Sequence, residues 1–148
     1  MIVVSACLAG IRCRYDGRDY LVSGVAALAA QGRTILVCPE VLGGLPIPRA
    51  SVEQVNGRMM TENGDDLTAQ FIAGAEIALN IARLAGCTAA ILKSRSPTCG
   101  CGEIYDGTFS GQLMKGDGIF CTMLKGGGMK VYTENDLDII GALAENSD

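Results

Sequence analysis

Four short apolar runs, separated by helical stretches, constrain the fold of this sequence most strongly. The runs are Ile2 to Ser5, Thr34 to Val37, Ala89 to Leu92 and Lys130 to Tyr132. Continuous apolar runs rich in β-branched residues are typical of strands buried on both faces of a sheet. Because these strands alternate with helices, we expect an α/β fold with an open, mainly parallel, Rossmann-like sheet of about four to five strands and helices on both faces.

The helical stretches are Val22 to Gln31, Asp66 to Ala85 and Ile119 to Lys125, followed by a final helix that begins at Thr133. Thr133-Glu134-Asn135-Asp136 resembles a capping box with aspartate in the usual place of glutamate. On the long helix, apolar residues at helical spacing predict the face that covers the sheet. They are Phe71, Ile72, Ile77, Leu79, Ile81 and Leu84.

Length and charge narrow the function classes. A chain of 148 residues is expected to form a single domain, residues 1–148. The net charge is −4, and lysines and arginines form no cluster, which disfavours a nucleic-acid duplex or an anionic membrane surface as partner. A small-molecule substrate is the expected partner. The apolar amino terminus has no basic region before it and predicts a buried strand, so we expect a cytoplasmic protein.

Two irregular stretches, Val41 to Gly64 and Pro97 to Gly118, are longer than simple connections in a compact domain. Loops of that length usually carry function or contain small elements of their own. In the second stretch, Ile104 to Tyr105 and Thr108 to Phe109 flank Asp106-Gly107 and predict a small hairpin.

Three of the seven cysteines follow the ends of predicted strands: Cys7, Cys38 and Cys99. Ligands of open parallel sheets bind beyond the carboxyl ends of the strands, so cysteines that are far apart in sequence can meet there. A metal or iron–sulfur site held by these three residues is the leading hypothesis.

The other four cysteines fall into two classes. Cys87 and Cys121 are expected in the core, where free cysteine is common. Cys13 and Cys101 lie in loops beside the presumed site, and either could be a fourth ligand or a nearby thiol. An odd number of cysteines in a cytoplasmic protein is poorly explained by a disulfide framework.

The chain contains no histidine, which excludes Cys-His dyads, histidine-dependent serine triads and mixed Cys/His zinc sites. Structural zinc usually binds close cysteine pairs with a two-residue spacer, and none is present. Widely separated thiolates favour an iron–sulfur cluster, and three protein ligands would leave one iron open to substrate. Two alternatives remain open: a cluster-free thiol or persulfide protein that uses Cys99 and Cys101, and a zinc-stabilised domain.

Without histidine, a carboxylate is the natural general base or acid. Glu40 is the strongest candidate because it follows Cys38 by two residues, and Asp16 is a second catalytic candidate. Glu53 and Asp106 also lie in loops expected to line the crevice.

A polar run follows the third apolar run directly. Lys93, Ser94, Arg95 and Ser96 are placed to hold a carbonyl, a phosphate or the edge of a nucleobase. We expect Lys93, Ser94 and Ser96 to take part in catalysis by positioning the substrate.

Longer motifs contain these residues. They are Ser5-Ala6-Cys7-Leu8-Ala9-Gly10, Cys38-Pro39-Glu40-Val41-Leu42-Gly43-Gly44-Leu45-Pro46 with Pro48-Arg49, and Leu92-Lys93-Ser94-Arg95-Ser96-Pro97-Thr98-Cys99-Gly100. With Tyr105-Asp106-Gly107-Thr108-Phe109-Ser110-Gly111, they resemble a bacterial family long described as a domain of unknown function, which includes the iron–sulfur-dependent thiouracil desulfidases.

The resemblance implies a [4Fe-4S] cluster held by Cys7, Cys38 and Cys99 and a desulfidase that removes sulfur from a thiolated pyrimidine, such as thiouracil, without net redox change. Two positions depart from the expected pattern. Thr98 stands where serine is expected, and Cys101 is an additional thiol beside the third ligand.

Overall fold

A computed structural model describes residues 1–146 of the chain. Its centre is a four-stranded parallel sheet with the strand order β2-β1-β5-β8. The strands are β1 (Ile2–Ser5), β2 (Thr34–Val37), β5 (Ala89–Leu92) and β8 (Lys130–Thr133). Each predicted apolar run forms one of these strands. The predicted parallel sheet is therefore confirmed, and the structure adds the strand order.

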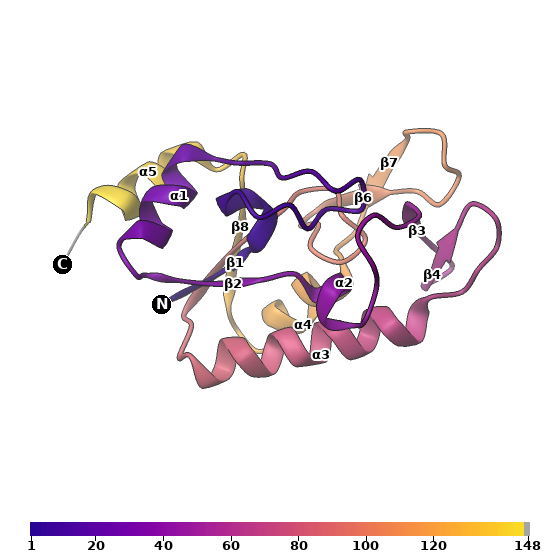
Figure 1. The fold of residues 1–148 in the computed structure, drawn as a ribbon, viewed down its shortest axis with the longest axis horizontal. Helices are drawn as coiled ribbons and strands as arrows, with labels where there is room; N and C mark the ends of the chain where they lie inside the picture. Colours follow the sequence, from indigo (N-terminus) through magenta and orange to yellow (C-terminus); the bar gives the residue numbers. More distant parts are fainter. Residues whose placement is uncertain (147–148) are drawn as a thin grey trace.

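Helices cover both faces of the sheet, as expected (Figure 1). On one face, α1 (Ser23–Ala30) packs against α5 (Leu137–Glu145). On the other, α3 (Thr68–Leu84) packs against α4 (Ile119–Gly126). Two apolar cores result, one on each side of the strands. This layering leaves the two ends of the sheet free for loops.

The buried face of α3 differs from the predicted one. Of the predicted residues, Phe71 is fully buried, but Ile72, Ile77 and Leu84 are 39%, 44% and 81% exposed. The other buried positions hold the small residues Gly74, Ala75, Ala78 and Ala82. The short helix α2 (Pro39–Leu42) explains part of this choice, because a Cβ atom on Gly74 would lie 1.8 Å from the carbonyl oxygen of Pro39. Leu79 and Ile81 pack against the core as predicted, and the prediction is wrong for Ile72, Ile77 and Leu84. Close approach of backbones requires small residues, which a search for large apolar residues overlooks.

The last helix begins at Leu137, four residues later than predicted. Thr133 instead ends β8, where it pairs with Leu92. Part of the expected box survives as a turn, since the Thr133 amide donates to Asp136 Oδ2 at 2.8 Å. Pairing with β5 therefore decided the conformation of Thr133 over its local capping preference.

Both irregular stretches contain hairpins, and the second is longer than predicted. The first holds β3 (Val52–Val55) and β4 (Arg58–Thr61), and the second holds β6 (Glu103–Tyr105) and β7 (Leu113–Lys115). The prediction that Thr108 and Phe109 form a strand is wrong: they lie in the connecting loop. Figure 1 shows the hairpins together, at the end of the molecule away from both termini.

Within the described residues 1–146, no helix is both long and apolar enough to span a membrane.

Candidate active site

A pocket of about 650 Å³ lies beyond the carboxyl ends of the strands. Residues that follow all four sheet strands line it, and the two hairpins supply the outer wall through residues such as Val52, Glu53, Tyr105 and Phe109. This is the position at which open parallel sheets bind ligands. The prediction of a crevice at this edge is therefore matched by a cavity large enough for a small molecule.

Cys7, Cys38 and Cys99 all line this pocket, together with Cys13. Cys7 lies in a 3₁₀ turn, Ala6–Ala9, that directly follows β1, and Cys38 precedes α2 directly. The Cys13 side chain contacts those of Cys7 and Cys38, and Cys38 Sγ lies 3.7 Å from the carbonyl oxygen of Cys13. The topology thus brings the three strand-end thiols into one cavity and adds a fourth.

Burial and contact with neighbouring thiols raise the pKa values of Cys38 and Cys99, so both favour the protonated form when no cation is present. The hydrogen bond with Cys13, and then burial, raise the pKa of Cys38 far above its ordinary value. Burial also raises the pKa of Cys99, although the Ser5 side chain opposes this. A bound metal would replace those protons with positive charge. A concentrated set of soft sulfur donors fits an iron–sulfur cluster better than it fits a hard cation.

Glu40 also lines the pocket, and both of its carboxylate oxygens have partners. Arg49 Nε donates to Oε1 at 2.9 Å, and Thr98 Oγ1 donates to Oε2 at 3.0 Å. Arg49 Nη2 donates to the Cys13 carbonyl at 2.8 Å, and Nη2 lies 4.0 Å from Cys38 Sγ. Arg49 therefore connects Glu40 to the thiol wall. Its role was not predicted, although it stands in one of the motifs quoted above.

The opposite wall is built around Glu134, which the sequence reasoning did not assign to the site. Glu134 is 5% exposed and directly follows β8. Its carboxylate accepts from the Ser94 amide at 2.7 Å and from the Ser94 hydroxyl at 2.8 Å, and it lies 2.9 Å from Lys93 Nζ. Lys93 Nζ also lies 4.6 Å from the centre of the Tyr20 ring. The strand-end rule that selected the cysteines would have found Glu134 too.

The electrostatics of Glu134 follow from these contacts. Burial alone would raise its pKa, but the Lys93 ammonium and the Ser94 donors outweigh burial and hold the pKa below its ordinary value. Glu134 is therefore a carboxylate at neutral pH, and it fixes Lys93 and Ser94 in place.

Ser96 supports the loop that carries Cys99. Its hydroxyl oxygen accepts from the amides of Thr98 and Cys99 at 3.1 and 3.0 Å. Because this oxygen serves as acceptor in both bonds, the hydroxyl hydrogen stays available to a ligand. Ser94 has the opposite arrangement, since it donates its hydrogen to Glu134 and keeps acceptor capacity.

The other predicted carboxylates serve the loops. Asp16 is exposed, accepts from the Arg18 amide at 3.0 Å, and is not part of the pocket lining described for residues 1–146. Glu53 lines the pocket, but its Oε1 accepts from the amides of Gly107 and Phe109 and so holds the loop between β6 and β7. Asp106 accepts from the Thr108 amide and hydroxyl.

The remaining cysteines lie apart from this pocket. Cys121 is fully buried, as predicted, whereas Cys87 is half-buried and packs against the same core. The Cys101 side chain lies beside that of Cys121 and not in the lining of the pocket that the described residues form. Its predicted alternative role as an extra ligand beside Cys99 therefore has no support in the geometry.

Aromatic side chains gather at the pocket. The chain has four tyrosines and three phenylalanines, and Tyr15, Tyr20, Tyr105 and Phe109 line the cavity. Arg14 lies over the rings of Tyr15 and Tyr20, at 5.9 and 5.7 Å from the ring centres. Aromatic and guanidinium faces favour a flat, conjugated ligand.

Together, the fold and the pocket define a class: an α/β protein with a thiol-lined small-molecule site at the carboxyl edge of a parallel sheet. Comparison with known proteins identifies the family. The sequence model of the 2-thiouracil desulfurase family matches residues 2–136, and the chain belongs to this family. The resemblance seen in the motifs is thereby confirmed.

Two relatives extend the comparison. The chain is 38% identical to the uncharacterized protein YbbK of Bacillus subtilis (strain 168), over 95% of this chain and 99% of YbbK. The structure of this chain is similar to that of the [4Fe-4S]-dependent thiouracil desulfidase TudS, with a TM-score of 0.90 and 44% identity. That match covers 97% of this chain and 95% of TudS, so the similarity extends over the whole fold.

Proposed function

We propose that this protein is a [4Fe-4S]-dependent thiouracil desulfidase. In the overall reaction, thiouracil and water give uracil and hydrogen sulfide, so oxygen replaces sulfur on the ring carbon with no net oxidation or reduction. The observation that carries the proposal is the meeting of Cys7, Cys38 and Cys99 in one pocket, opposite a wall of fixed polar groups. Membership of the family and the similarity to TudS support it.

Cys7, Cys38 and Cys99 would hold the cluster, and Cys13 would support the thiol wall through its contacts with Cys7 and Cys38. When bound by three cysteines, such a cluster supplies a Lewis-acidic iron with an open position for a soft sulfur atom. Free thiols of this kind persist in a reducing compartment, so the proposal places the protein in the cytoplasm.

Lys93, Ser94 and Ser96 would orient the substrate ring. A pyrimidine amide presents an N–H donor beside a carbonyl acceptor. Ser94 Oγ can accept from the N–H because its own hydrogen is donated to Glu134, and the Ser96 hydroxyl can donate to the carbonyl. Lys93, held by Glu134, adds a fixed positive charge that would stabilise the negative charge developing on the substrate as water adds to the thiocarbonyl carbon.

Glu40 would move the proton of the attacking water. It lies on the pocket wall beside Cys38, and each of its oxygens is held by one donor and so retains acceptor capacity for a water hydrogen. The bonds from Arg49 and Thr98 fix the carboxylate in one orientation, which a general base needs.

The test is turnover by anaerobically purified protein. With 2-thiouracil as substrate, we expect equal amounts of uracil and sulfide, together with about four iron atoms and acid-labile sulfides per chain, as a [4Fe-4S] cluster requires. Cys38→Ser should lose both iron and turnover. Cys87→Ser is the matched control, because Cys87 lies outside the pocket, and it should keep both. Turnover by iron-free protein, or equal iron loss from both variants, would falsify the proposal.

The cluster-free alternative relied on Cys99 and Cys101 as a reactive pair. These two thiols lie on different sides of their loop, since Cys99 lines the pocket and Cys101 contacts Cys121. The arrangement therefore favours the cluster-dependent function.

A further inference from the structure

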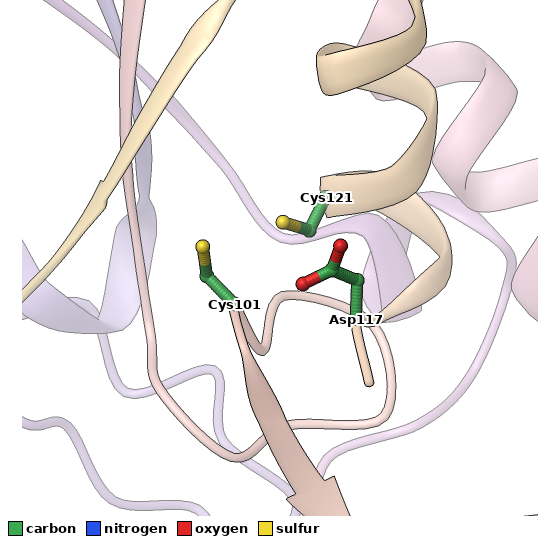
Figure 2. A group of neighbouring side chains, drawn as sticks. All are labelled: Cys101, Asp117 and Cys121. Carbon is green, nitrogen blue, oxygen red and sulfur yellow. The ribbon is translucent and has the colours of Figure 1, made fainter. Parts of the chain in front are cut away.

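A second group of metal-binding side chains lies outside the pocket. The Sγ atoms of Cys101 and Cys121 and a carboxylate oxygen of Asp117 all lie within 4.8 Å of one another. Figure 2 shows the three side chains pointing toward a common space between the loop before β6 and the first turn of α4. We propose that Cys101, Asp117 and Cys121 bind a soft divalent cation, Zn²⁺ in the first instance, at a site separate from the cluster thiols.

The donor set and its dimensions fit zinc. Zinc binds cysteine sulfur at about 2.3 Å and carboxylate oxygen at about 2.0 to 2.2 Å, so tetrahedral donors lie about 3.5 to 3.8 Å apart. Separations of up to 4.8 Å need a contraction of at most about 1.3 Å, within the reach of side-chain rotation. Two sulfurs make the site soft, which disfavours Mg²⁺ and Ca²⁺. A water molecule would complete the tetrahedron.

Backbone hydrogen bonds hold the donors in place before any ion binds. The Gly118 amide donates to the Gly100 carbonyl at 2.7 Å, and the Gly102 amide donates to Asp117 Oδ1 at 2.7 Å. A Cβ atom on Gly118 would lie 2.3 Å from the backbone of Thr98, so this close approach needs glycine. Asp117 directly precedes Gly118, the N-cap of α4, and Cys121 lies in the first turn of this helix, so both side chains stand at its amino end.

The charge around the site also suits a cation with three anionic ligands. Binding releases the two thiol protons, and two thiolates and a carboxylate around a divalent ion leave one negative charge. The Lys125 ammonium lies 3.2 and 3.1 Å from the two Asp117 oxygens and approaches Cys101, so it offsets that charge. Its side chain is 42% exposed and can move to give the ion one carboxylate oxygen.

The proposed ion would connect the pocket wall to α4. Cys101 stands between the Cys99 loop and β6, and the hairpin that begins with β6 contributes Tyr105 and Phe109 to the pocket. A zinc ion at this position would therefore fix a wall of the substrate site without contacting the substrate.

The test measures zinc and iron together on anaerobic, iron-loaded protein, in which the pocket thiols are already occupied. After incubation with Zn²⁺ and removal of unbound ion, we expect about one zinc per chain, with two sulfur neighbours in the zinc X-ray absorption spectrum. Cys101→Ser and Asp117→Asn should each raise the zinc Kd, by at least about 100-fold for the thiol ligand. Cys87→Ser should leave it unchanged.

These variants keep the test decisive. Cys121 is fully buried and its replacement endangers folding, whereas Cys101 is half-buried and Asp117 lies in a loop. Zinc that persists in Cys101→Ser, or zinc with three or four sulfur neighbours, would overturn the proposal in favour of binding in the pocket. A zinc-free protein with a Cys101–Cys121 disulfide would overturn it as well. Iron content in the same samples reports the proposed function separately.

Discussion

Cysteines of this protein form two spatial groups whose surroundings differ. Cys7, Cys13, Cys38 and Cys99 line a cavity of about 650 Å³, whereas Cys101 stands in the loop before β6 and faces Cys121 in the first turn of α4 (Figure 2). The first group has room beside it for a cofactor and a ring. The second has the Asp117 carboxylate beside it, which in turn pairs with the Lys125 ammonium. Space and partners, more than the thiols themselves, decide which chemistry each group can support.

The carboxylates of the two groups differ in the same way. Glu40 is held by Arg49 and Thr98 and still lines the pocket, so it is available to water and substrate. Asp117 is held by Gly102 and Lys125, away from the substrate. In the pocket group, a carboxylate that can act as a base faces a cavity. In the second group, the carboxylate and the two thiols can serve as metal ligands, and neighbouring residues hold the carboxylate in place.

The largest expected difference between the groups concerns the cluster ligands. Cys99→Ser should remove iron and abolish sulfide release, while Cys101→Ser should retain iron and most of the turnover, because only the first thiol lines the pocket. Iron per chain and sulfide release from 2-thiouracil measure this. If Cys101→Ser lost iron to the same degree, the separation of the two groups would be wrong.

The carboxylates of the two groups, Glu40 and Asp117, allow a second test, in which the expected effect is of intermediate size. Glu40→Gln should lower kcat about 100-fold at unchanged iron content, as expected for loss of a general base. Asp117→Asn should lower kcat far less, because Asp117 is outside the pocket lining that residues 1–146 form and would act on the pocket only through the wall that the proposed ion fixes. Steady-state kinetics at neutral pH would check both variants, and an equal fall in kcat would show that Glu40 has no special role.

The packing of α3 against α2, the helix that follows Cys38, allows a third test. Gly74→Ala should destabilise the fold by about 3 kcal/mol, because its Cβ would meet the Pro39 carbonyl at 1.8 Å and displace α2, which follows Cys38. Gly141→Ala in α5 is the control. Beyond its own helix backbone and chain neighbours, no atom of residues 1–146 lies within 4 Å of its added Cβ, so alanine should stabilise this helix by about 1 kcal/mol. Denaturant unfolding gives both values, and equal effects would contradict the packing argument.

The smallest expected effect concerns the polar wall. Glu134→Gln should lower the free energy of unfolding by about 1–2 kcal/mol at neutral pH, because it removes the buried charge that pairs with half-buried Lys93. The pKa of Glu134 is lowered on folding, so its stabilising effect is complete above the ordinary value of 4.5 and is lost as the pH falls through the folded value.

The difference in the free energy of unfolding between the unmodified protein and Glu134→Gln should therefore be largest near neutral pH and should shrink below about pH 4.5. Unfolding curves at several pH values measure this. A gap that does not change with pH would indicate a packing effect of the substitution and not an electrostatic one.

Much of the pocket was predictable because parallel sheets gather strand ends. The four strands were read from apolar runs, and the position of Cys7, Cys38 and Cys99 after three of them indicated a shared site. Glu134 follows the fourth strand and was accessible to the same reasoning. It was assigned to a helix cap, because local sequence suggested capping and gave no sign that β5 pairs with β8 through Thr133.

What the sequence alone determined is the chemistry available: seven thiols without histidine, strands buried on both faces, and polar residues at strand ends. Only the tertiary structure decided which thiols share a cavity. Cys99 and Cys101 are two residues apart, yet one meets Cys38 and Glu40 at the pocket while the other meets Cys121 and Asp117. The reason is that the loop turns between them, and its direction is set by long-range hydrogen bonds such as Gly118 to Gly100, which no local pattern encodes.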